Sequence, residues 1–586
     1  MTRPAQPSPL ESQPPPSAQG MAARLGFHLP TETADGQARA AALGAAQVSG
    51  RVPTSLVSYQ SSGSLLVIGP EPYARSQAEA LADRLRCTVL ATDADGSTKT
   101  SPGAGEGAHS IQVVRAKLVE LTGHLGAFSA TVAVGDEPVD LARAAGEGRE
   151  RFDLVLDLSR TPHIRHEVPP PGYYAPGRDA DALYRALAEI PELVGEFEKP
   201  KFFHYDADIC AHAASGLNGC NRCLDACPTG AITSLAERIE VDPYLCQGGG
   251  SCATACPTGA ITYTYPQVSD LLAEVRALLA TYRERGGTRG SLLFHDGGEG
   301  RAWMAEIGPA MPERLLPFEV EEIGGVGMDA WLSVLAYGAS EVILLAPPST
   351  PPSARAELER QLGYARALLQ GMGHSGERLR LVCAADPSRA LRELHALAGT
   401  PAPPPAGFAA LDEKRTTLRL AIDHLYAHAP APVAAAPLPR GAPFGEVRFD
   451  HDACTLCMAC VSVCPAAALE PGEETPALRF IEWNCVQCGL CEAACPEDAI
   501  APSPRILYDP EKRMARRLLK QEEPFQCVVC GKPFATQSVM SRMREKLQGH
   551  WMFQKPEALR RLEMCEDCRV KDMFAREGGL IDPTRK

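Results

Sequence analysis

The sequence predicts a multidomain protein that combines α/β and α+β folds. In two separate stretches, apolar strand-like segments alternate with amphipathic helix-like segments, which is typical of parallel sheets covered by helices. In two further stretches and in the C-terminal region, all but two of the 21 cysteines fall in short spacings. The length of 586 residues is enough for about four domains of ordinary size.

The N-terminal part contains the first α/β pattern. Residues 1–60 are rich in Ala, Pro, Ser and Gly, and we expect most of them to be disordered. Residues 61–200 predict an α/β domain. A strand at 64–70, a helix at 72–85 and a strand at 87–94 have the outline of a nucleotide-binding unit. Because Gly69 is followed by Pro-Glu-Pro, the G-x-G-x-x-G fingerprint is absent, and we interpret the domain as one without a nucleotide. Further strands are expected at 111–118, 128–134 and 152–158.

The second α/β pattern lies in residues 271–400 and predicts a flavodoxin-like domain. Strands are expected at 291–294, 314–319, 341–345 and 378–382, and helices at 301–307, 328–337, 354–372 and 387–398. Residues 401–443 form two Pro/Ala-rich linkers with one helix at 411–428 between them. We expect these linkers to isolate the module that follows.

Residues 444–510 contain the most specific motif, C-x2-C-x2-C-x3-C-P, twice in succession. This repeat is the signature of bacterial ferredoxins with two [4Fe–4S] clusters. Zinc sites use separated cysteine pairs, so the triplets favour iron–sulfur over zinc or disulfides. Each triplet can cover three corners of one cube, and the fourth cysteine reaches the neighbouring cube. The predicted ligands are Cys454, Cys457, Cys460 and Cys495 for one cluster, and Cys485, Cys488, Cys491 and Cys464 for the other.

Residues 201–270 predict a variant of the same module. Nine residues separate Cys210 from Cys220, and this small-residue insert should bulge and still return Cys210 to its cluster. In the second half, Gly249 stands where the second cysteine of the motif belongs. The predicted ligands are Cys210, Cys220, Cys223 and Cys256 for one cluster, and only Cys227, Cys246 and Cys252 for the other.

A cube with three thiolates has one uncovered iron. It either loses that iron and becomes [3Fe–4S], or keeps it as a labile [4Fe–4S] centre with water, hydroxide or a ligand from elsewhere. Complete loss of this cluster is the alternative. The chain is therefore expected to bind three [4Fe–4S] clusters and one such variant.

The C-terminal tail, residues 511–586, contains two C-x2-C pairs. The pairs Cys527/Cys530 and Cys565/Cys568 predict a zinc-ribbon-like site of four thiolates, with a further iron–sulfur centre as the alternative. The tail has 17 Lys and Arg against 11 Asp and Glu, a net charge of +6. Such a surface could dock on an acidic partner or simply be solvated. The isolated Cys87 and Cys383 are expected to be buried, inert thiols.

Composition limits the class of protein. The net charge of −14 argues against a general nucleic-acid binder. The N-terminus has no signal-peptide pattern, and no apolar run is long enough to cross a bilayer. Grouped thiolates suit a reducing compartment. We therefore expect a cytoplasmic protein without a transmembrane segment, which could still be a peripheral subunit of a membrane enzyme.

The chain beyond about residue 60 resembles the large 4Fe–4S binding proteins of proteobacteria that accompany molybdenum or tungsten formate dehydrogenases. The resemblance rests on G-C-N-R-C-L-D-A-C-P-T-G-A-I (219–232), on the paired motifs, and on C-G-K-P-F with M-C-E-D-C-R-V in the tail. Residues 289–400 also resemble the iron–sulfur subunit of methyl-viologen-reducing hydrogenase. That family holds a [2Fe–2S] cluster on cysteines, whereas this stretch has only Cys383, so the resemblance carries no cluster over. The resemblance to the 4Fe–4S binding proteins implies a redox partner, such as a formate dehydrogenase.

These patterns predict a multi-cluster electron carrier that serves a redox enzyme and has no catalytic residues of its own. One alternative is a flavin-dependent oxidoreductase subunit, although no glycine fingerprint or acid–base pair supports it. The other is an adaptor or maturation factor in which the metal sites have a structural role.

Overall fold

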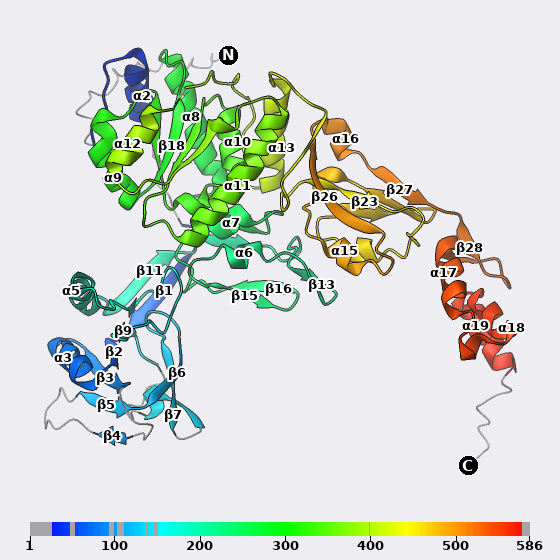
Figure 1. Ribbon diagram of the computed structural model, residues 1–586, viewed down its shortest axis with the longest axis horizontal. Helices are drawn as coiled ribbons and strands as arrows, with labels where there is room; N and C mark the ends of the chain where they lie inside the picture. Colours follow the sequence, from blue (N-terminus) through cyan, green and yellow to red (C-terminus); the bar gives the residue numbers. More distant parts are fainter. Residues whose placement is uncertain are drawn as a thin grey trace, which may run out of the picture.

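The computed structural model describes residues 26–46, 53–92, 99–101, 111–134, 137–144, 151–397 and 399–576. Figure 1 shows four parts in an arch: an N-terminal lobe, a central α/β body with the first cysteine module beneath it, the second cysteine module, and the tail. Its mixed α/β and α+β content agrees with the predicted fold class.

The N-terminal lobe is built on a six-stranded sheet with the order β10-β9-β2-β3-β5-β4. All neighbouring strands are parallel except β4, which is antiparallel to β5. Two helices pack on one face of the sheet, and a three-stranded antiparallel sheet lies on the other. The strand expected at 111–118 is divided between these sheets. The elements are β2 (Ser64–Gly69), α3 (Glu71–Leu81), β3 (Arg86–Ala91), β4 (Lys99–Ser101), β5 (Gln112–Arg115), β6 (Lys117–Thr122), β7 (Ser129–Val134), β8 (Glu137–Asp140), α4 (Leu141–Ala144), β9 (Leu154–Asp157), β10 (Tyr173–Tyr174) and α5 (Ala180–Glu189).

The central body is a four-stranded parallel sheet with the order β19-β18-β20-β21 and with helices on both sides. This order is that of a doubly wound sheet, and its strands and helices follow the predicted alternation. The elements are α8 (Val268–Glu284), β18 (Ser291–Asp296), α9 (Glu299–Ile307), β19 (Leu315–Val320), α10 (Met328–Ala336), β20 (Val342–Leu345), α11 (Pro352–Gly371), β21 (Leu379–Val382) and α12 (Pro387–His395).

Two helices join this body from segments that the sequence assigns elsewhere. Helix α2 (Ala34–Ala45) lies in the stretch expected to be mostly disordered, yet it packs against α8. The Arg39 guanidinium is fully buried and donates to the carbonyl oxygens of Pro312 and Leu315, both at 3.1 Å. Helix α13 (Lys414–Ala427) confirms the helix predicted at 411–428, but it packs along α10 and belongs to the core, so the expectation that this stretch isolates the next module is wrong.

The two cysteine modules share a core of two antiparallel strand pairs and two short helices, one for each half of the motif. Strands β1 (Leu56–Ser61) and β11 (Gly195–Pro200) pair with one another and connect the N-terminal lobe to the first module. The first module has β12 (Phe203–Tyr205), β13 (Ala213–Ala214), β14 (Leu217–Asn218), α6 (Arg222–Asp225), β15 (Ile232–Leu235), β16 (Arg238–Val241), α7 (Ser251–Ala255) and β17 (Ile261–Tyr263). The second has β22 (Ala435–Pro437), β23 (Gly445–Phe449), α14 (Ala459–Ser462), β24 (Leu469–Pro471), β25 (Ala477–Phe480), α15 (Leu490–Ala494), β26 (Ile500–Leu507) and α16 (Pro510–Met514). The hairpin β13–β14 in the first module, and β22 and α16 in the second, add to the shared core.

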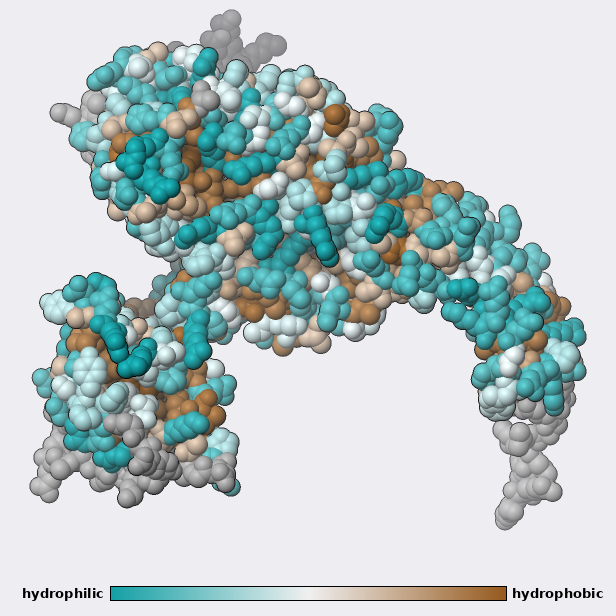
Figure 2. All heavy atoms as spheres, in the orientation of Figure 1, coloured by the Kyte–Doolittle hydropathy of each residue, from teal (hydrophilic) through white to brown (hydrophobic). Residues whose placement is uncertain are grey.

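The tail continues from β27 (Arg517–Gln521), which pairs with β25 of the second module. It then forms the hairpin β28 (Pro524–Gln526) and β29 (Pro533–Thr536), followed by α17 (Gln537–Leu547), α18 (Pro556–Leu562) and α19 (Glu566–Arg576). Its visible face is largely hydrophilic (Figure 2). Among the described residues, no helix has the length and apolar composition that crossing a bilayer requires.

Candidate metal centres

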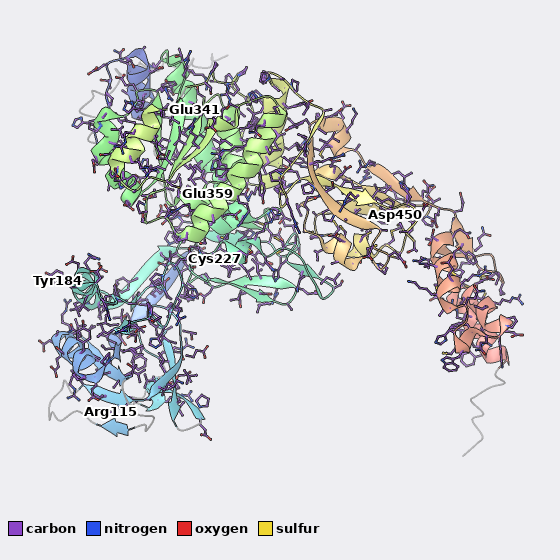
Figure 3. The ribbon with its side chains drawn as sticks, in the orientation of Figure 1. Arg115, Tyr184, Cys227, Glu341, Glu359 and Asp450 are labelled. Carbon is purple, nitrogen blue, oxygen red and sulfur yellow. The ribbon has the colours of Figure 1, made fainter. Side chains whose placement is uncertain are left out.

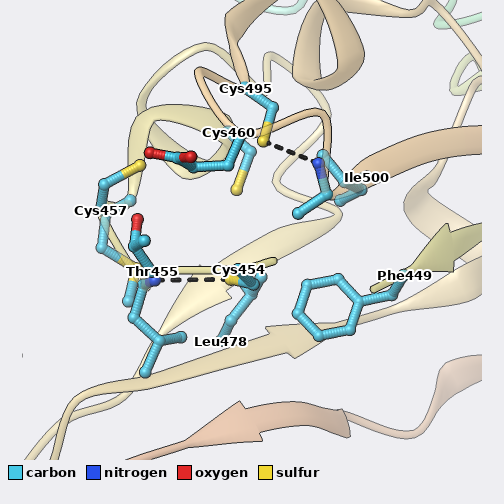
Figure 4. Close-up of a pocket in the computed structure, with 12 residues that line it drawn as sticks. Phe449, Cys454, Thr455, Cys457, Cys460, Leu478, Cys495 and Ile500 are labelled. Atoms are coloured by element: carbon cyan, nitrogen blue, oxygen red, sulfur yellow. Dashed lines mark hydrogen bonds between the residues drawn. The ribbon is translucent and has the colours of Figure 1, made fainter. Parts of the chain in front are cut away.

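In the second module, each predicted group of four cysteines lines a single cavity. Cys454, Cys457, Cys460 and Cys495 line one cavity together with Phe449, Leu478 and Ile500 (Figure 4). Cys464, Cys485, Cys488 and Cys491 line the other, with Val447, Leu469 and Phe480 among its apolar walls. Each cavity therefore takes three cysteines from one copy of the motif and the fourth from the other copy, as the spacing predicts.

The backbone of these loops turns inward at positions around the second cysteine. The residues on either side of Cys457, Leu456 and Met458, have φ angles of 55° and 62°. Those on either side of Cys488, Gln487 and Gly489, have φ angles of 57° and 85°. These left-handed residues curl the chain so that its N–H groups point at sulfur. A residue other than glycine is strained in this region unless the surroundings hold it, and such residues are found most often at functional sites.

Hydrogen bonds to sulfur are present in both halves of the second module. The Leu456 N–H donates to Cys454 Sγ at 3.4 Å, and the Ala499 N–H donates to Cys495 Sγ at 3.2 Å; Figure 4 draws both bonds as dashed lines. In the other half, the Ala468 N–H donates to Cys464 Sγ at 3.3 Å, and Gln487 Nε2 donates to Cys485 Sγ at 3.2 Å. Such donors stabilise negative charge on sulfur and so tune the potential of a bound cluster.

In the first module, Cys210, Cys220, Cys223 and Cys256 also line one cavity. The insert before Cys220 forms the hairpin β13–β14, whose base is closed by the Cys220 N–H donating to the Ala211 carbonyl at 2.8 Å. Buried His212 braces the hairpin through contacts of its ring nitrogens with the Cys220 carbonyl (3.0 Å) and Ser234 Oγ (2.7 Å). The insert thus bulges outward and returns Cys210 to its cavity, as expected.

The remaining three cysteines, Cys227, Cys246 and Cys252, also lie near one another. Burial, and then the neighbouring thiolates of Cys246 and Cys227, raise the pKa of Cys252 well above its usual value. Gly249 lies in the Cys246 loop in the motif position of Cys457 and Cys488. A Cβ at Gly249 would meet only Pro228 Cγ within 4 Å, at 3.7 Å, so none of the described side chains occupies the space directly beside this position.

Burial raises the pKa of several thiols in the two modules, which keeps these thiols protonated at neutral pH when no metal is bound. It raises the pKa of Cys220 and of Cys488 to about 11, and that of Cys460 to about 12, with neighbouring thiolates adding to the shift in Cys488 and Cys460. Several thiolates can share such a site only if a cation compensates them. The donor set therefore fits a metal cluster, which requires deprotonated sulfur.

A lysine ammonium is bound at the backbone carbonyl of a cysteine in three of the four groups. Lys199 Nζ donates to the Cys246 carbonyl (2.7 Å), Lys414 Nζ to that of Cys256 (2.9 Å) and Lys520 Nζ to that of Cys454 (2.5 Å). No local pattern in the sequence points to these lysines, because they lie 47, 158 and 66 residues from their partners. Only the folded topology brings them to the cysteine loops.

The two modules touch at the hairpin of the first. A Cβ at Gly219 would lie 3.0 Å from Leu490 Cγ, and Arg222 donates to the Gly441 carbonyl at 2.6 Å. Gly219 precedes Cys220, and Leu490 lies between Cys488 and Cys491. The contact therefore joins the four-cysteine cavity of the first module to one cavity of the second.

The tail brings its four cysteines together. The sulfur atoms of Cys527, Cys530, Cys565 and Cys568 all lie within 4.8 Å of one another. This compact set matches the closed four-thiolate arrangement of structural metal sites. The tail is attached next to the second module: Thr536 donates to the Thr455 carbonyl at 2.8 Å, and Arg542 and Lys546 form ion pairs with Glu497.

The two isolated cysteines differ from one another. Cys87 is buried, as expected. The prediction of a buried thiol is wrong for Cys383, which is exposed. It directly follows β21, where the chain leaves the sheet for the surface turn before α12.

Two stretches of the chain, residues 218–260 and 453–499, match the family model of the 4Fe–4S dicluster domain. The chain carries two ferredoxin-type 4Fe–4S domains. The first match begins after Cys210 and leaves out most of the insert before Cys220, whereas it includes Gly249. No curated protein matches the chain.

Proposed function

We propose that this iron–sulfur protein relays electrons through four clusters to or from a redox enzyme. The proposed ligands are the three four-cysteine sets and the set Cys227, Cys246 and Cys252. A bound cluster supplies one-electron redox chemistry. The chain contributes apolar walls, N–H donors to sulfur, and lysines whose charge favours the more negative, reduced state.

The observation that carries this proposal is the contact between the modules at Gly219 and Leu490. An adaptor would not need its two dicluster modules to touch at the cysteine loops, whereas a relay requires short distances between successive clusters. Within each module the two groups are also adjacent. Burial is the main cause of the raised pKa of Cys491, and Cys460 of the neighbouring group contributes; Cys223 contributes in the same way to the raised pKa of Cys252 in the first module.

The test is potentiometric titration of anaerobically purified protein, followed by EPR. A relay requires that the clusters of both modules reduce and reoxidise reversibly in the biological range. If no cluster cycles reversibly, the relay is excluded and the adaptor or maturation role is favoured. The partner is tested separately. We propose a formate dehydrogenase, on the resemblance alone, and formate-dependent reduction of the clusters by the copurified enzyme would support it.

For the tail we propose a structural zinc ion on its four cysteines. A closed zinc site of four thiolates conducts no electrons, so its role would be to fold the tail against the Cys454 loop. Metal analysis of the purified tail-site variant Cys565→Ser, compared with the wild-type chain, tests this: zinc content should fall by one ion per chain and iron content should not change.

A flavin-dependent role is the second candidate, because one cavity adjoins a cluster group. This cavity of about 420 Å³ lies between β17, the start of α10 and the start of α13. Thr258 and Ile261 line both this cavity and the Cys210 group. Its volume is within the range of small-molecule sites. A flavin spectrum from denatured protein would establish this role.

A further inference from the structure

The three glycines at positions 248–250 do not have the same conformational requirement. Gly248 and Gly250 have φ angles of 78° and 71°. A Cβ at Gly248 would lie 2.8 Å from the Phe202 ring, and one at Gly250 would lie 2.3 Å from Gly325 Cα. Glycine is therefore required at both positions. Gly249 has no left-handed φ, and a Cβ there meets only Pro228 Cγ at ordinary contact distance.

This pattern repeats the backbone of the complete motifs. In the second module, left-handed residues lie on both sides of Cys457 and Cys488, whereas the cysteines themselves are not left-handed. The loop of the first module that begins at Cys246 keeps this curl and lacks only the thiolate. Its fold would accept a side chain at Gly249, so the packing does not explain the glycine.

The position is also accessible. Gly249 is partly exposed, whereas Gly248 and Gly250 are buried. On one side the Val168 N–H donates to the Pro228 carbonyl at 3.1 Å, and on the other Gln247 Nε2 donates to the Pro169 carbonyl at 2.7 Å. Figure 3 shows Cys227 where the first module meets the N-terminal lobe and the lower end of α11. Cys227 thus lies at a junction of three parts of the molecule, and Gly249 of the same cysteine group is partly exposed.

An anionic ligand would restore the charge of a complete site. A cluster with three thiolates carries one negative charge fewer than one with four. The Lys199 ammonium lies 2.7 Å from the Cys246 carbonyl oxygen and 2.9 Å from that of Tyr244. The carboxylate of Asp242 accepts the N–H groups of Tyr244 and Leu245 and so faces the backbone.

We propose that the corner beside Gly249 is a binding site for a small monodentate anion from solution, such as a thiolate or a carboxylate. The anion donates a lone pair to the uncovered iron, and no electron is transferred. This inference rests on the proposed cluster at Cys227, Cys246 and Cys252, and adds ligand recognition to the relay.

The test uses the full chain, loaded anaerobically with Fe²⁺ under dithionite, with isotope-labelled cyanide as the probe. In the wild-type chain, the reduced cluster should show a hyperfine coupling to the label. Gly249→Ala is the matched control: it adds a Cβ without a ligand atom and should keep the coupling. Gly249→Cys supplies the fourth thiolate, so the hyperfine coupling should be lost in this variant.

No coupling in the wild-type chain or in Gly249→Ala would overturn the proposal, and so would an equal coupling in Gly249→Cys. If Gly249→Cys does not fold, the wild-type and Gly249→Ala spectra still decide. Reversible reduction of the clusters without any cyanide coupling would exclude the anion site and leave the relay intact, so the two failures are distinguishable.

Discussion

At the scale of single residues, the motif determines where the cysteines lie, whereas the tertiary fold brings lysines and N–H donors to them. The ligand sets could be predicted because the 2-2-3 spacing is dictated by the shape of the cube. The lysines on the cysteine carbonyls could not, because each comes from a distant element. Lys414 is the clearest example: its ammonium also donates to the carbonyls of Ala253 and Thr254, at the end of α7.

Lys414→Met should lower the midpoint potential of the cluster held by the Cys210 group. Removal of a cation makes the added electron less favourable, by on the order of tens of millivolts. Redox titration of the EPR signal measures the shift. Lys414→Arg, which keeps the charge, should restore most of the potential, and an unchanged potential in the methionine variant would show that the lysine is only structural.

Asp157 should make the N-terminal lobe sensitive to acid. The carboxylate is fully buried, which alone would raise its pKa, but bonds from the Tyr173 hydroxyl (2.6 Å) and the His163 N–H (2.9 Å) outweigh burial and lower the pKa below 3.8. A carboxylate whose pKa is lower in the folded state than in the unfolded state stabilises the fold at pH values above its unfolded-state pKa. This stabilisation is lost as the pH falls through the folded-state pKa. Asp157→Asn should cost about 1–3 kcal/mol at pH 7 in chemical denaturation, and less at pH 3. An equal cost at both pH values would contradict this.

At the scale of elements, helix α13 connects the central body to the second module. Its Arg415 is buried between the rings of Phe444 and Trp483, at 5.0 and 4.6 Å, and donates to the Pro443 and Trp483 carbonyls. Because Pro and Ala dominate on both sides of the predicted helix, the composition suggested that the whole stretch separates the two parts of the protein. The helix itself is amphipathic, but its tertiary partners cannot be read from its own residues.

Arg415→Met should loosen the second module from the body. Two buried carbonyl oxygens lose their hydrogen-bond donor, which lowers the free energy of unfolding by about 1–3 kcal/mol. Hydrogen exchange should increase in residues 438–444 and around Trp483, whereas the N-terminal lobe should exchange as before. Lys414→Met, at the adjacent position on the helix, is the control that should leave exchange at Trp483 unchanged.

At the scale of the whole molecule, the order of parts along the chain matches their order in space, except that helix α2 precedes the N-terminal lobe in sequence and packs in the central body. The alternation of strands and helices was enough to predict both α/β parts and the doubly wound sheet. The contact between the modules and the incorporation of α2 into the body depend on long-range packing, for which no local pattern exists. Gly249 could be recognised as a missing ligand from spacing, but its exposure and unstrained backbone required the structure.

Loss of the tail metal should affect the neighbouring module selectively. In Cys565→Ser, the four-cysteine site of the tail no longer holds α17 in place. The hydrogen bond from Thr536 to Thr455 and the ion pairs with Glu497 should therefore weaken. Iron should therefore leave the second module several-fold faster in air, measured as loss of visible absorbance and EPR signal. Equal rates in both modules would indicate that the tail does not shield the Cys454 group.

The β13–β14 hairpin lengthens a spacing that is otherwise fixed, and the same hairpin leads into the residue that meets Leu490. Trimming it to two residues would give a regular first motif and a domain that resembles an independent carrier more closely. It would also remove the contact between the first and second cysteine modules. The irregularity that makes this motif hard to recognise is thus also the part of the first module that contacts the second, and the proposed relay depends on that contact.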